Sequence, residues 1–274
     1  MSEITFTGTD FGPVPVTSVR LYSDTTPMIK MEQFMEVVEN ADTMILRPKS
    51  LASFVEAMFL VDAINENGGM IDHLVLPYVP GARQDRSNPT GDVLFTLRSV
   101  AEMINVRDFE SVTILDPHSP ETVKRIRNVE VYPLHYVAAK VWQGYTGIIS
   151  ADKGGKDRAE QFAKAMGKPI YYGTKHRDVS TGKLSGFSLD TIPFGHYLVV
   201  DDICDGGGTF IGLAEQIEKQ GSFADLFVTH GIFSKGTSDL RQHYKNIYTT
   251  DSRDIHDTHV HIIPVVEEME HYNG

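Results

Sequence analysis

Three aspartates, three consecutive glycines and a threonine stand near the end of this chain in an order that could bind a sugar phosphate. An apolar run ends in two of the aspartates, and a helical pattern begins at the threonine. The pattern indicates a buried strand, a tight turn and a helix N-terminus, where glycine amides and the helix dipole attract phosphate. Carboxylates suit the hydroxyl groups of a ribose. The residues are Asp201, Asp202, Asp205, Gly206, Gly207, Gly208 and Thr209.

A second polar cluster, Gly81-Ala-Arg-Gln-Asp-Arg86, directly follows another apolar run. Arg83, Gln84 and Asp85 offer the donors and acceptors that a purine and a polyphosphate require, and arginine binds phosphate in a bidentate manner. A solvated surface turn is the alternative interpretation, because runs of charge are usually exposed. We expect this cluster to contact a nucleotide.

His118 and Asp152 each follow an apolar run and are candidate ligands of a metal ion. Mg²⁺ prefers oxygen ligands and usually keeps several waters, so a magnesium–nucleotide site needs few protein ligands. An ordinary structural or surface role for the histidine is the alternative.

A basic segment, Thr174-Lys-His-Arg-Asp178, offers two cations at one place. Lys175 and Arg177 are expected to close over a polyphosphate as a lid and to stabilise charge that shifts during a transfer reaction. An ordinary mobile loop between two strands is the alternative.

Strand-like and helix-like patterns alternate along the chain, which predicts an α/β fold with mostly parallel sheets and helices on both faces. The polar clusters follow apolar strands, and ligands of such sheets bind outside the carboxyl ends of the strands. A domain boundary is expected near residue 145, giving domains 1–145 and 146–274. We expect strands near 42–47, 72–78, 111–116, 146–151, 196–200, 224–229, 246–249 and 259–263. Helices are expected near 31–39, 51–66, 92–105, 119–127, 136–144, 155–166, 209–220 and 235–243.

Composition limits the class of partner. The chain has 274 residues and a net charge of −12, which argues against nucleic-acid binding because a basic stripe is not visible. Its single cysteine, Cys204, excludes an intramolecular disulfide and fits a reducing compartment. A secretion signal is not evident, and apolar runs stay below the roughly 18 residues of a membrane span. A cytoplasmic protein without a membrane partner is expected.

Six segments, in the same order along the chain, resemble the motifs of one enzyme family. They are Leu76–Arg86, Leu115–His118, Asp152–Gly155, Lys175–Arg177, Val199–Thr209 and Thr229–Ser234. The first five resemble, in turn, the signature, the metal-binding segment, the Asp-x-Gly-Gly motif, the catalytic lid and the ribose-phosphate loop of ribose-phosphate pyrophosphokinases. Phosphoribosyltransferases share the ribose-phosphate loop more loosely. The motifs cover most of the chain.

The resemblance implies two phosphoribosyltransferase-like domains, with ATP on 1–145 and a ribose phosphate on 146–274. It also implies Mg²⁺ as cofactor and a homo-oligomer, either a dimer or a hexamer. In the family a loop of a neighbouring subunit completes the adenine site. Here the matching stretch contains Tyr22 and Asp24, and His118 is expected at ATP as well as at the metal.

Two positions depart from the family pattern. Thr26 stands where the family usually has a glutamate, and Gly206 stands where the family commonly has a threonine that helps to hold the terminal phosphate of the sugar. Gly206 removes a hydroxyl donor and clears space. The pocket is therefore expected either to compensate with backbone amides or to admit a ribose whose 5′-phosphate carries a further group, such as ADP-ribose, which would link it to NAD metabolism.

The implied reaction transfers the diphosphoryl group of ATP to the anomeric C1 hydroxyl of ribose 5-phosphate, giving phosphoribosyl pyrophosphate and AMP. Lys175 and Arg177 are the expected catalytic residues, and Arg83, Gln84 and Asp85 the ATP-binding ones. One alternative is a phosphoribosyltransferase, which consumes the activated sugar and needs no ATP site. Another is a non-catalytic subunit that assembles with an active synthetase.

Overall fold

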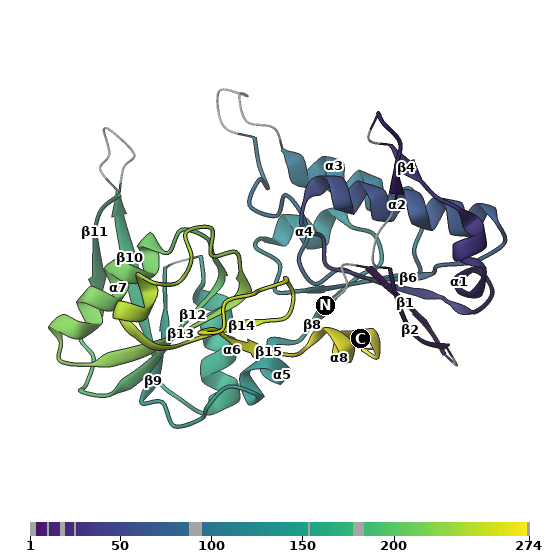
Figure 1. Ribbon diagram of the computed structural model, residues 1–274. Coiled ribbons are helices and arrows are strands. Elements are labelled where there is room, and N and C mark those ends of the chain that lie inside the picture. The colour runs from purple at the N-terminus through teal and green to yellow at the C-terminus, as the bar shows by residue number, and fades with distance from the viewer. Residues whose placement is uncertain are drawn as a thin grey trace. The chain divides into compact units, whose positions relative to one another are not determined.

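The computed structural model describes residues 4–9, 11–16, 20–24, 26–87, 95–152, 154–177 and 184–272, without the side chains of residues 20–21, 176–177 and 184–185. The chain forms two compact units (Figure 1). The first unit consists of residues 1–132, 252–254 and 266–274, and the second of residues 133–251 and 255–265. The division falls after Tyr132 rather than near residue 145, because helix α5 (Leu134–Ala139) packs against helix α6 (Lys156–Met166) of the second unit.

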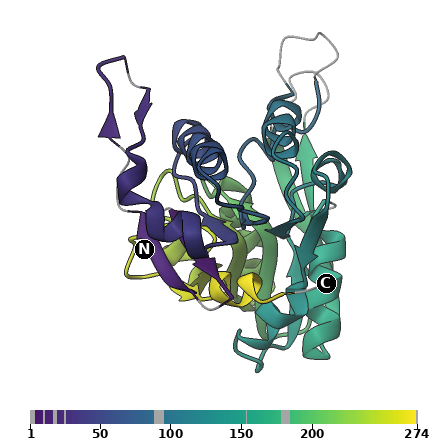
Figure 2. The same ribbon diagram turned by 90° about the vertical axis from the view of Figure 1, so that its right-hand side faces the viewer.

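The first unit is built on a six-stranded sheet in the order β2-β1-β5-β6-β7-β8. Strands β5 to β8 run parallel, whereas β1 pairs antiparallel with both β2 and β5. A separate hairpin of β3 (Arg20–Leu21) and β4 (Pro27–Met28) stands away from this sheet (Figure 2). The sheet strands are β1 (Ile4–Gly8), β2 (Phe11–Val16), β5 (Thr43–Leu46), β6 (His73–Val75), β7 (Ser111–Leu115) and β8 (Val129–Tyr132).

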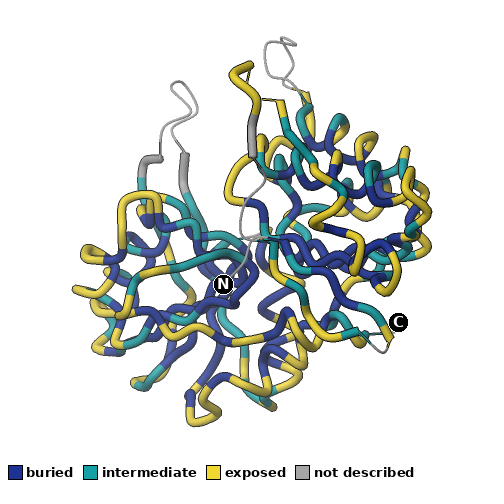
Figure 3. Tube along the Cα trace, turned by 45° about the vertical axis from the view of Figure 1, so that its right-hand side comes forward, coloured by how far each residue is buried: buried dark blue, intermediate teal, exposed yellow. Residues whose placement is uncertain are grey.

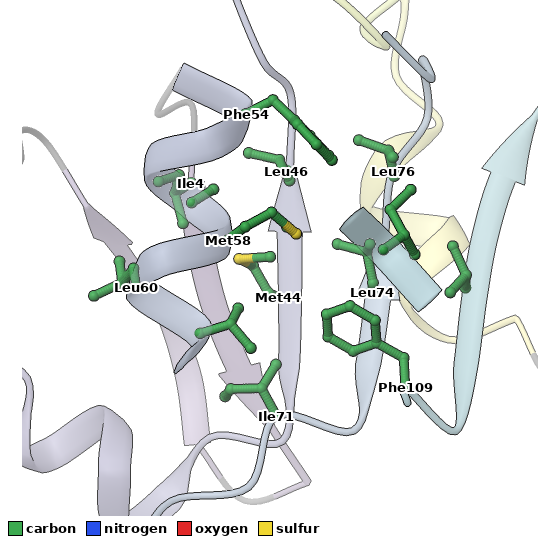
Figure 4. Close-up of a cluster of buried hydrophobic side chains, with 14 of the residues drawn as sticks. Ile4, Met44, Leu46, Phe54, Met58, Leu60, Ile71, Leu74, Leu76 and Phe109 are labelled. Atoms are coloured by element: carbon green, nitrogen blue, oxygen red, sulfur yellow. The ribbon is translucent and has the colours of Figure 1, made fainter. Parts of the chain in front are cut away.

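Helix α2 (Leu51–Glu66) packs the apolar core of the first unit against the sheet. Phe54 and Met58 point from this helix toward Met44 and Leu46 of β5 (Figure 4), and each of the four side chains is at most 2% exposed. The helix begins after Ser50, which forms a capping box with Ser53. A capping box is a local sequence signal for the start of a helix. The other helical segments of this unit are η1 (Met31–Gln33), α1 (Met35–Asn40), α3 (Thr96–Asn105), α4 (Pro120–Arg125) and α8 (Val266–Glu270).

The second unit contains a seven-stranded sheet in the order β11-β10-β9-β12-β13-β14-β15. All neighbouring strands run parallel except the hairpin of β10 and β11. The central strands are buried over almost their whole length (Figure 3), as expected for a sheet covered on both faces. The strands are β9 (Gly147–Ser150), β10 (Ile170–Arg177), β11 (Leu184–Leu189), β12 (His196–Cys204), β13 (Phe223–Gly231), β14 (Tyr244–Thr250) and β15 (His261–Ile263).

Helices cover both faces of this second sheet. Leu213 of α7 (Gly208–Lys219) belongs to one apolar cluster with Leu226 and Val228 of β13. Phe227, between them, contacts Phe162 of α6, with ring centroids 4.7 Å apart. Because successive side chains of a strand point to opposite faces, α6 and α7 lie on opposite sides of the sheet. A single 3-10 turn, η2 (Leu240–Gln242), follows β13.

The two sheets flanked by helices confirm the α/β class expected from the sequence. Several elements differ from the expectation. The helix expected at 235–243 is reduced to η2, since Gly236 has a φ of +70° and breaks the helical pattern. Strands β1, β2, β8, β10 and β11 lie where strands were not expected. Within the described ranges, no helix combines the length and apolar character that crossing a membrane requires.

Candidate functional site

Three neighbouring parallel strands of the second unit end at one edge of its sheet, and each leads into polar side chains. Strand β9 leads into Asp152, β12 carries Asp201 and Asp202 near its end, and β13 carries Thr229 and His230 near its end. The order β9-β12-β13 places these ends side by side. This is the edge at which parallel α/β sheets bind ligands.

Asp152 is bound from two sides. Its Oδ2 atom lies 2.6 Å from Lys175 Nζ, and its Oδ1 atom accepts hydrogen bonds from the amides of Gly154 and Gly155 at 2.8 and 3.1 Å. Burial alone would raise the pKa of Asp152, but the hydrogen bond and charge of Lys175, together with the two amides, hold this pKa below its usual value. Asp152 is therefore an anion at neutral pH in a fixed position.

The acidic pair Asp201 and Asp202 shares a buried arginine that the sequence analysis did not identify. Arg158 of α6 places Nη1 3.2 Å from Asp201 Oδ1 and Nη2 3.7 Å from Asp202 Oδ2. All three residues are less than 9% exposed. Burial and the neighbouring Asp202 charge raise the pKa of Asp201 to about 7, and Arg158 opposes this rise only in part.

The residues after β12 form the glycine turn, Asp205 to Gly208. Gly207 has a φ of +78°, and a Cβ there would meet the Leu240 side chain at 3.3 Å, so the position favours glycine on both grounds. Helix α7 begins at Gly208, and its first hydrogen bonds run from the amides of Phe210 and Ile211 to the Gly207 carbonyl. The amides before Phe210 therefore have no acceptor within the helix, which is the arrangement that binds phosphate.

Lys175 lies in a strand and not in a loop, contrary to the expectation. Strand β10 continues to Arg177 and pairs antiparallel with β11, so that Lys175 stands opposite Phe187. Tyr171, Tyr172, Thr174 and Phe187 are of residue types enriched in strands, which favours pairing in this edge hairpin over a mobile loop. The Arg177 side chain, expected in the lid with Lys175, lies outside the part of the chain that the structure describes, as do residues 178–183 and Lys153.

The first unit has a cavity of about 400 Å³ beside the cluster predicted to bind ATP. Gln84 and Gly81 line it together with Tyr78, Lys49 and Arg253. The Arg253 guanidinium stacks over the Tyr78 ring at 4.9 Å from its centroid. The cavity offers an amide, an aromatic face and two cations to a ligand.

The other residues predicted to contact the nucleotide do not line this cavity. Arg83 is exposed, whereas Asp85 is buried and lies 3.3 Å from Arg86 Nε. Tyr22 and Asp24 lie in the β3–β4 turn, where Asp24 accepts hydrogen bonds from the Thr26 amide and hydroxyl. These Thr26 hydrogen bonds lower the pKa of Asp24. Tyr22 is 54% exposed, and both side chains are outside the cavity lining.

The two candidate metal ligands belong to different units. His118 is an exposed residue of the first unit, just before α4, and Asp152 belongs to the second. Within the described part of the chain, three or more histidine, cysteine, aspartate or glutamate side chains do not gather as a metal site. A single fixed carboxylate such as Asp152 fits a hard cation that keeps waters and phosphate oxygens as its other ligands.

Arg158 is the residue of the candidate site that sequence reasoning missed. It stands three residues after Gly155 in the first turns of α6, where a basic side chain is usually exposed. The available signal was its short distance along the sequence from the Asp152–Gly155 motif. Its burial depends on how α6 packs over the end of β12, and this packing is not visible in the residue pattern.

No protein-family model matches this chain. The ribose-phosphate pyrophosphokinase of Thermococcus kodakarensis is 30% identical over 218 residues, which is 75% of this chain and 76% of that protein. The protein of the same name from Pyrococcus furiosus is 29% identical over 218 residues, with coverages of 75% and 76%.

A solved structure shares the fold. The phosphoribosylpyrophosphate synthetase from Mycobacterium smegmatis matches with a TM-score of 0.75 and 16% sequence identity, over 93% of this chain and 87% of that one. The match confirms the expected fold of two phosphoribosyltransferase-like units.

Proposed function

This chain belongs to the ribose-phosphate pyrophosphokinase family, and on that premise we propose that it transfers the diphosphoryl group of ATP to the anomeric C1 hydroxyl of ribose 5-phosphate. The products are phosphoribosyl pyrophosphate and AMP. The observation that carries the proposal is the position of Asp201 and Asp202 near the end of one buried strand, two residues before the glycine turn. One element thus offers carboxylates to ribose hydroxyls and amides to a phosphate.

The second unit binds the sugar in this proposal. Asp201 and Asp202 accept hydrogen bonds from the ribose hydroxyls, and Arg158 fixes both carboxylates in place. The 5′-phosphate sits at the glycine turn, against amides of Gly206 to Thr209 and the N-terminus of α7. The 30% identical relative carries the name of an enzyme of this chemistry, which supports the assignment.

The transfer is an in-line displacement at the β-phosphorus of ATP. The C1 oxygen forms a bond to this phosphorus while the bond to the oxygen of the α-phosphate breaks. AMP leaves with that electron pair, and the hydroxyl proton passes to solvent. Such a reaction depends on positioning and charge stabilisation. Lys175 and Arg177 stabilise the developing charge, and Arg83, Gln84 and Asp85 form the ATP site with Tyr22 and Asp24 of a neighbouring subunit.

Mg²⁺ is proposed as the cofactor of the reaction with ATP. Asp152, an anion fixed by Lys175 and two amides, and His118 are its proposed protein ligands. When bound, Mg²⁺ neutralises phosphate charge.

A ribose whose 5′-phosphate carries a further group, such as ADP-ribose, is a second candidate acceptor. A Cβ placed at Gly206 would meet the Lys235 side chain alone, no closer than 3.6 Å, among the residues that the structure describes. At Gly208 the same construction meets no described atom within 4 Å. This open face leaves space for a substituent on the phosphate.

The test is an AMP-release assay with ATP, Mg²⁺ and a panel of ribose, ribose 5-phosphate and ADP-ribose. We expect release to require a phosphorylated sugar and to be lost when both Asp201 and Asp202 are replaced by asparagine. The matched control is Asp157→Asn, which removes an exposed carboxylate of α6 and retains activity.

Two other outcomes would contradict the proposal. Release of pyrophosphate that depends on a nucleobase and needs no ATP would identify a phosphoribosyltransferase. Inactivity with every sugar, combined with binding to an active synthetase, would identify a non-catalytic subunit. The dimer or hexamer stays a prediction, which light scattering of the purified protein measures.

A further inference from the structure

The loop after β13 is fixed to the start of the glycine turn. The amides of Ile232 and Phe233 donate to the Cys204 carbonyl at 2.8 and 3.0 Å. The Ser234 hydroxyl donates to the Asp205 carboxylate. Main-chain and side-chain hydrogen bonds therefore hold this loop beside the turn that the proposed function assigns to phosphate.

Lys235, the next residue, lies over Gly206. A Cβ at Gly206 would be 3.6 Å from Lys235 Cε, 3.7 Å from its Cδ and 4.0 Å from its Nζ. The ammonium group thus occupies the side of the turn that a larger residue at 206 would cover. Lys235 is exposed, so a ligand entering the turn can reach it.

Among the residues that the structure describes, the charges at this edge of the sheet favour a further cation at the phosphate. Asp152, Asp201, Asp202 and Asp205 all lie there. Lys175 is paired with Asp152, and Arg158 with the acidic pair. A doubly negative phosphate would meet net negative charge at the turn if it had only the partial charge of amides and of the α7 N-terminus to bind.

We propose that Lys235 is a specificity-determining residue for the sugar substrate, whose ammonium group binds the 5′-phosphoryl group seated on the glycine turn. The inference rests on the proposed function and adds a contact to the same site. It explains how a turn with glycine at 206 holds phosphate, since the ammonium takes the place of a side-chain hydroxyl on that residue. The contact is a charge-assisted hydrogen bond, which is stronger than a neutral one.

The experiment compares Lys235→Met with the unaltered protein in steady-state kinetics. Methionine keeps an unbranched apolar stem over Gly206 and removes the charge. We expect KM for ribose 5-phosphate to rise about tenfold or more, which corresponds to about 1.4 kcal/mol. We expect kcat and KM for ATP to change by less than about twofold, because the contact is made equally before and during the transfer. Lys235→Arg retains most of the affinity.

Lys219→Met is the matched control. Lys219 is an exposed residue in the last turn of α7, roughly 16 Å along the helix from Gly208, so it tests the same loss of charge away from the turn. It is expected to leave both KM values unchanged. An equal effect of Lys219→Met and Lys235→Met would mean that net charge matters and would overturn the assignment.

A second substitution tests whether a hydroxyl group at position 206 can replace the Lys235 charge. Gly206→Thr adds a side chain where only the flexible end of Lys235 is near, so the residue fits without strain. In the Lys235→Met background, Gly206→Thr is expected to recover part of the lost affinity for ribose 5-phosphate. A further loss in the double variant would contradict the proposal.

Failure of this inference differs from failure of the proposed function. If the unaltered protein is active and Lys235→Met has the same KM for ribose 5-phosphate, the inference about Lys235 is overturned and the proposed function is not. If the unaltered protein is inactive, the proposed function is overturned. Calorimetry then measures whether Lys235→Met weakens the binding of ribose 5-phosphate, and equal binding by the two proteins refutes the role of Lys235. A preference for ribose 5-phosphate over ribose that falls about tenfold or more in Lys235→Met supports the contact, and an unchanged preference refutes it.

Discussion

Lys175 Nζ lies 2.6 Å from Asp152 Oδ2, so strand β10 is tied to the segment that follows β9. The two side chains are 22% and 27% exposed, which leaves both accessible to a ligand. The ammonium group is therefore held in place before a substrate binds. A polyphosphate that enters this edge meets a cation whose position has already been set.

Lys175→Ala is expected to lower kcat by about 10²-fold or more, because it removes a charge that stabilises the transferring phosphoryl group. The partly exposed ion pair adds little to stability, so the free energy of unfolding should change by less than about 1 kcal/mol. Steady-state AMP release and urea unfolding measure the two effects. Lys164→Ala, an exposed position of α6, is the control. Normal turnover in Lys175→Ala would refute the catalytic role.

Arg158→Met is expected to destabilise the protein by about 3–5 kcal/mol, because two buried carboxylates lose their shared cation. Adding Asp201→Asn should recover part of this loss, since one of the stranded charges disappears. Urea unfolding of the two single variants and the double variant measures the coupling. Additive effects would show that the guanidinium and the acidic pair act independently. Lys156→Met, on the exposed face of the same helix, should be nearly neutral.

Asp201→Asn should change how stability depends on pH. The pKa of Asp201 is about 7 in the folded protein against an ordinary value of 3.8, because of burial and the Asp202 charge. The folded state therefore binds more protons, and this group makes stability fall as pH rises from 3.8 to about 7. Asparagine keeps the oxygen that accepts from Asp202 N and Arg158 but does not titrate.

The measurement for Asp201→Asn is urea unfolding at several pH values. We expect the difference in unfolding free energy between variant and unaltered protein to shift in favour of the variant as pH rises through that window. Asp157→Asn, at an exposed position, serves as the control. Parallel pH profiles of the Asp201 variant and the unaltered protein would contradict the elevated pKa.

Gln84→Ala is expected to raise KM for ATP by about fivefold to tenfold, since it removes an amide from the cavity of the first unit. The Thr96 hydroxyl donates to Gln84, so the amide is oriented before binding. KM for ribose 5-phosphate should stay constant. Gln33→Ala removes an exposed amide of the same unit and should leave both constants unchanged. A rise in KM for ribose 5-phosphate alone would mean that ATP does not bind in this cavity.

The central strands could be predicted from sequence because each contains a short apolar run that ends in a polar cluster. Strands β5, β7, β9 and β12 lie close to their expected ranges. The β10–β11 hairpin was missed because an antiparallel pair at an edge needs apolar residues on only one face. Its basic residues, Lys175 among them, resemble those of a loop.

Part of the candidate site could also be predicted. Asp152, the acidic pair and the glycine turn meet at one sheet edge, since parallel strands end together. The roles of Arg158 and Lys235 could not be predicted in the same way. Each depends on a distance between segments far apart in sequence, Arg158 to Asp201 and Lys235 to Gly206.

The return of residues 252–254 and 266–274 to the first unit limits how the protein can be divided. A fragment that ends at Tyr132 lacks helix α8, which contacts strands β5 and β6 and carries the fully buried Met269. The complementary fragment would carry helix α8 without the sheet it covers. Neither piece from one cut is therefore self-sufficient. Independent expression of the first half would require a rearranged gene that splices codons 266–274 onto its own reading frame.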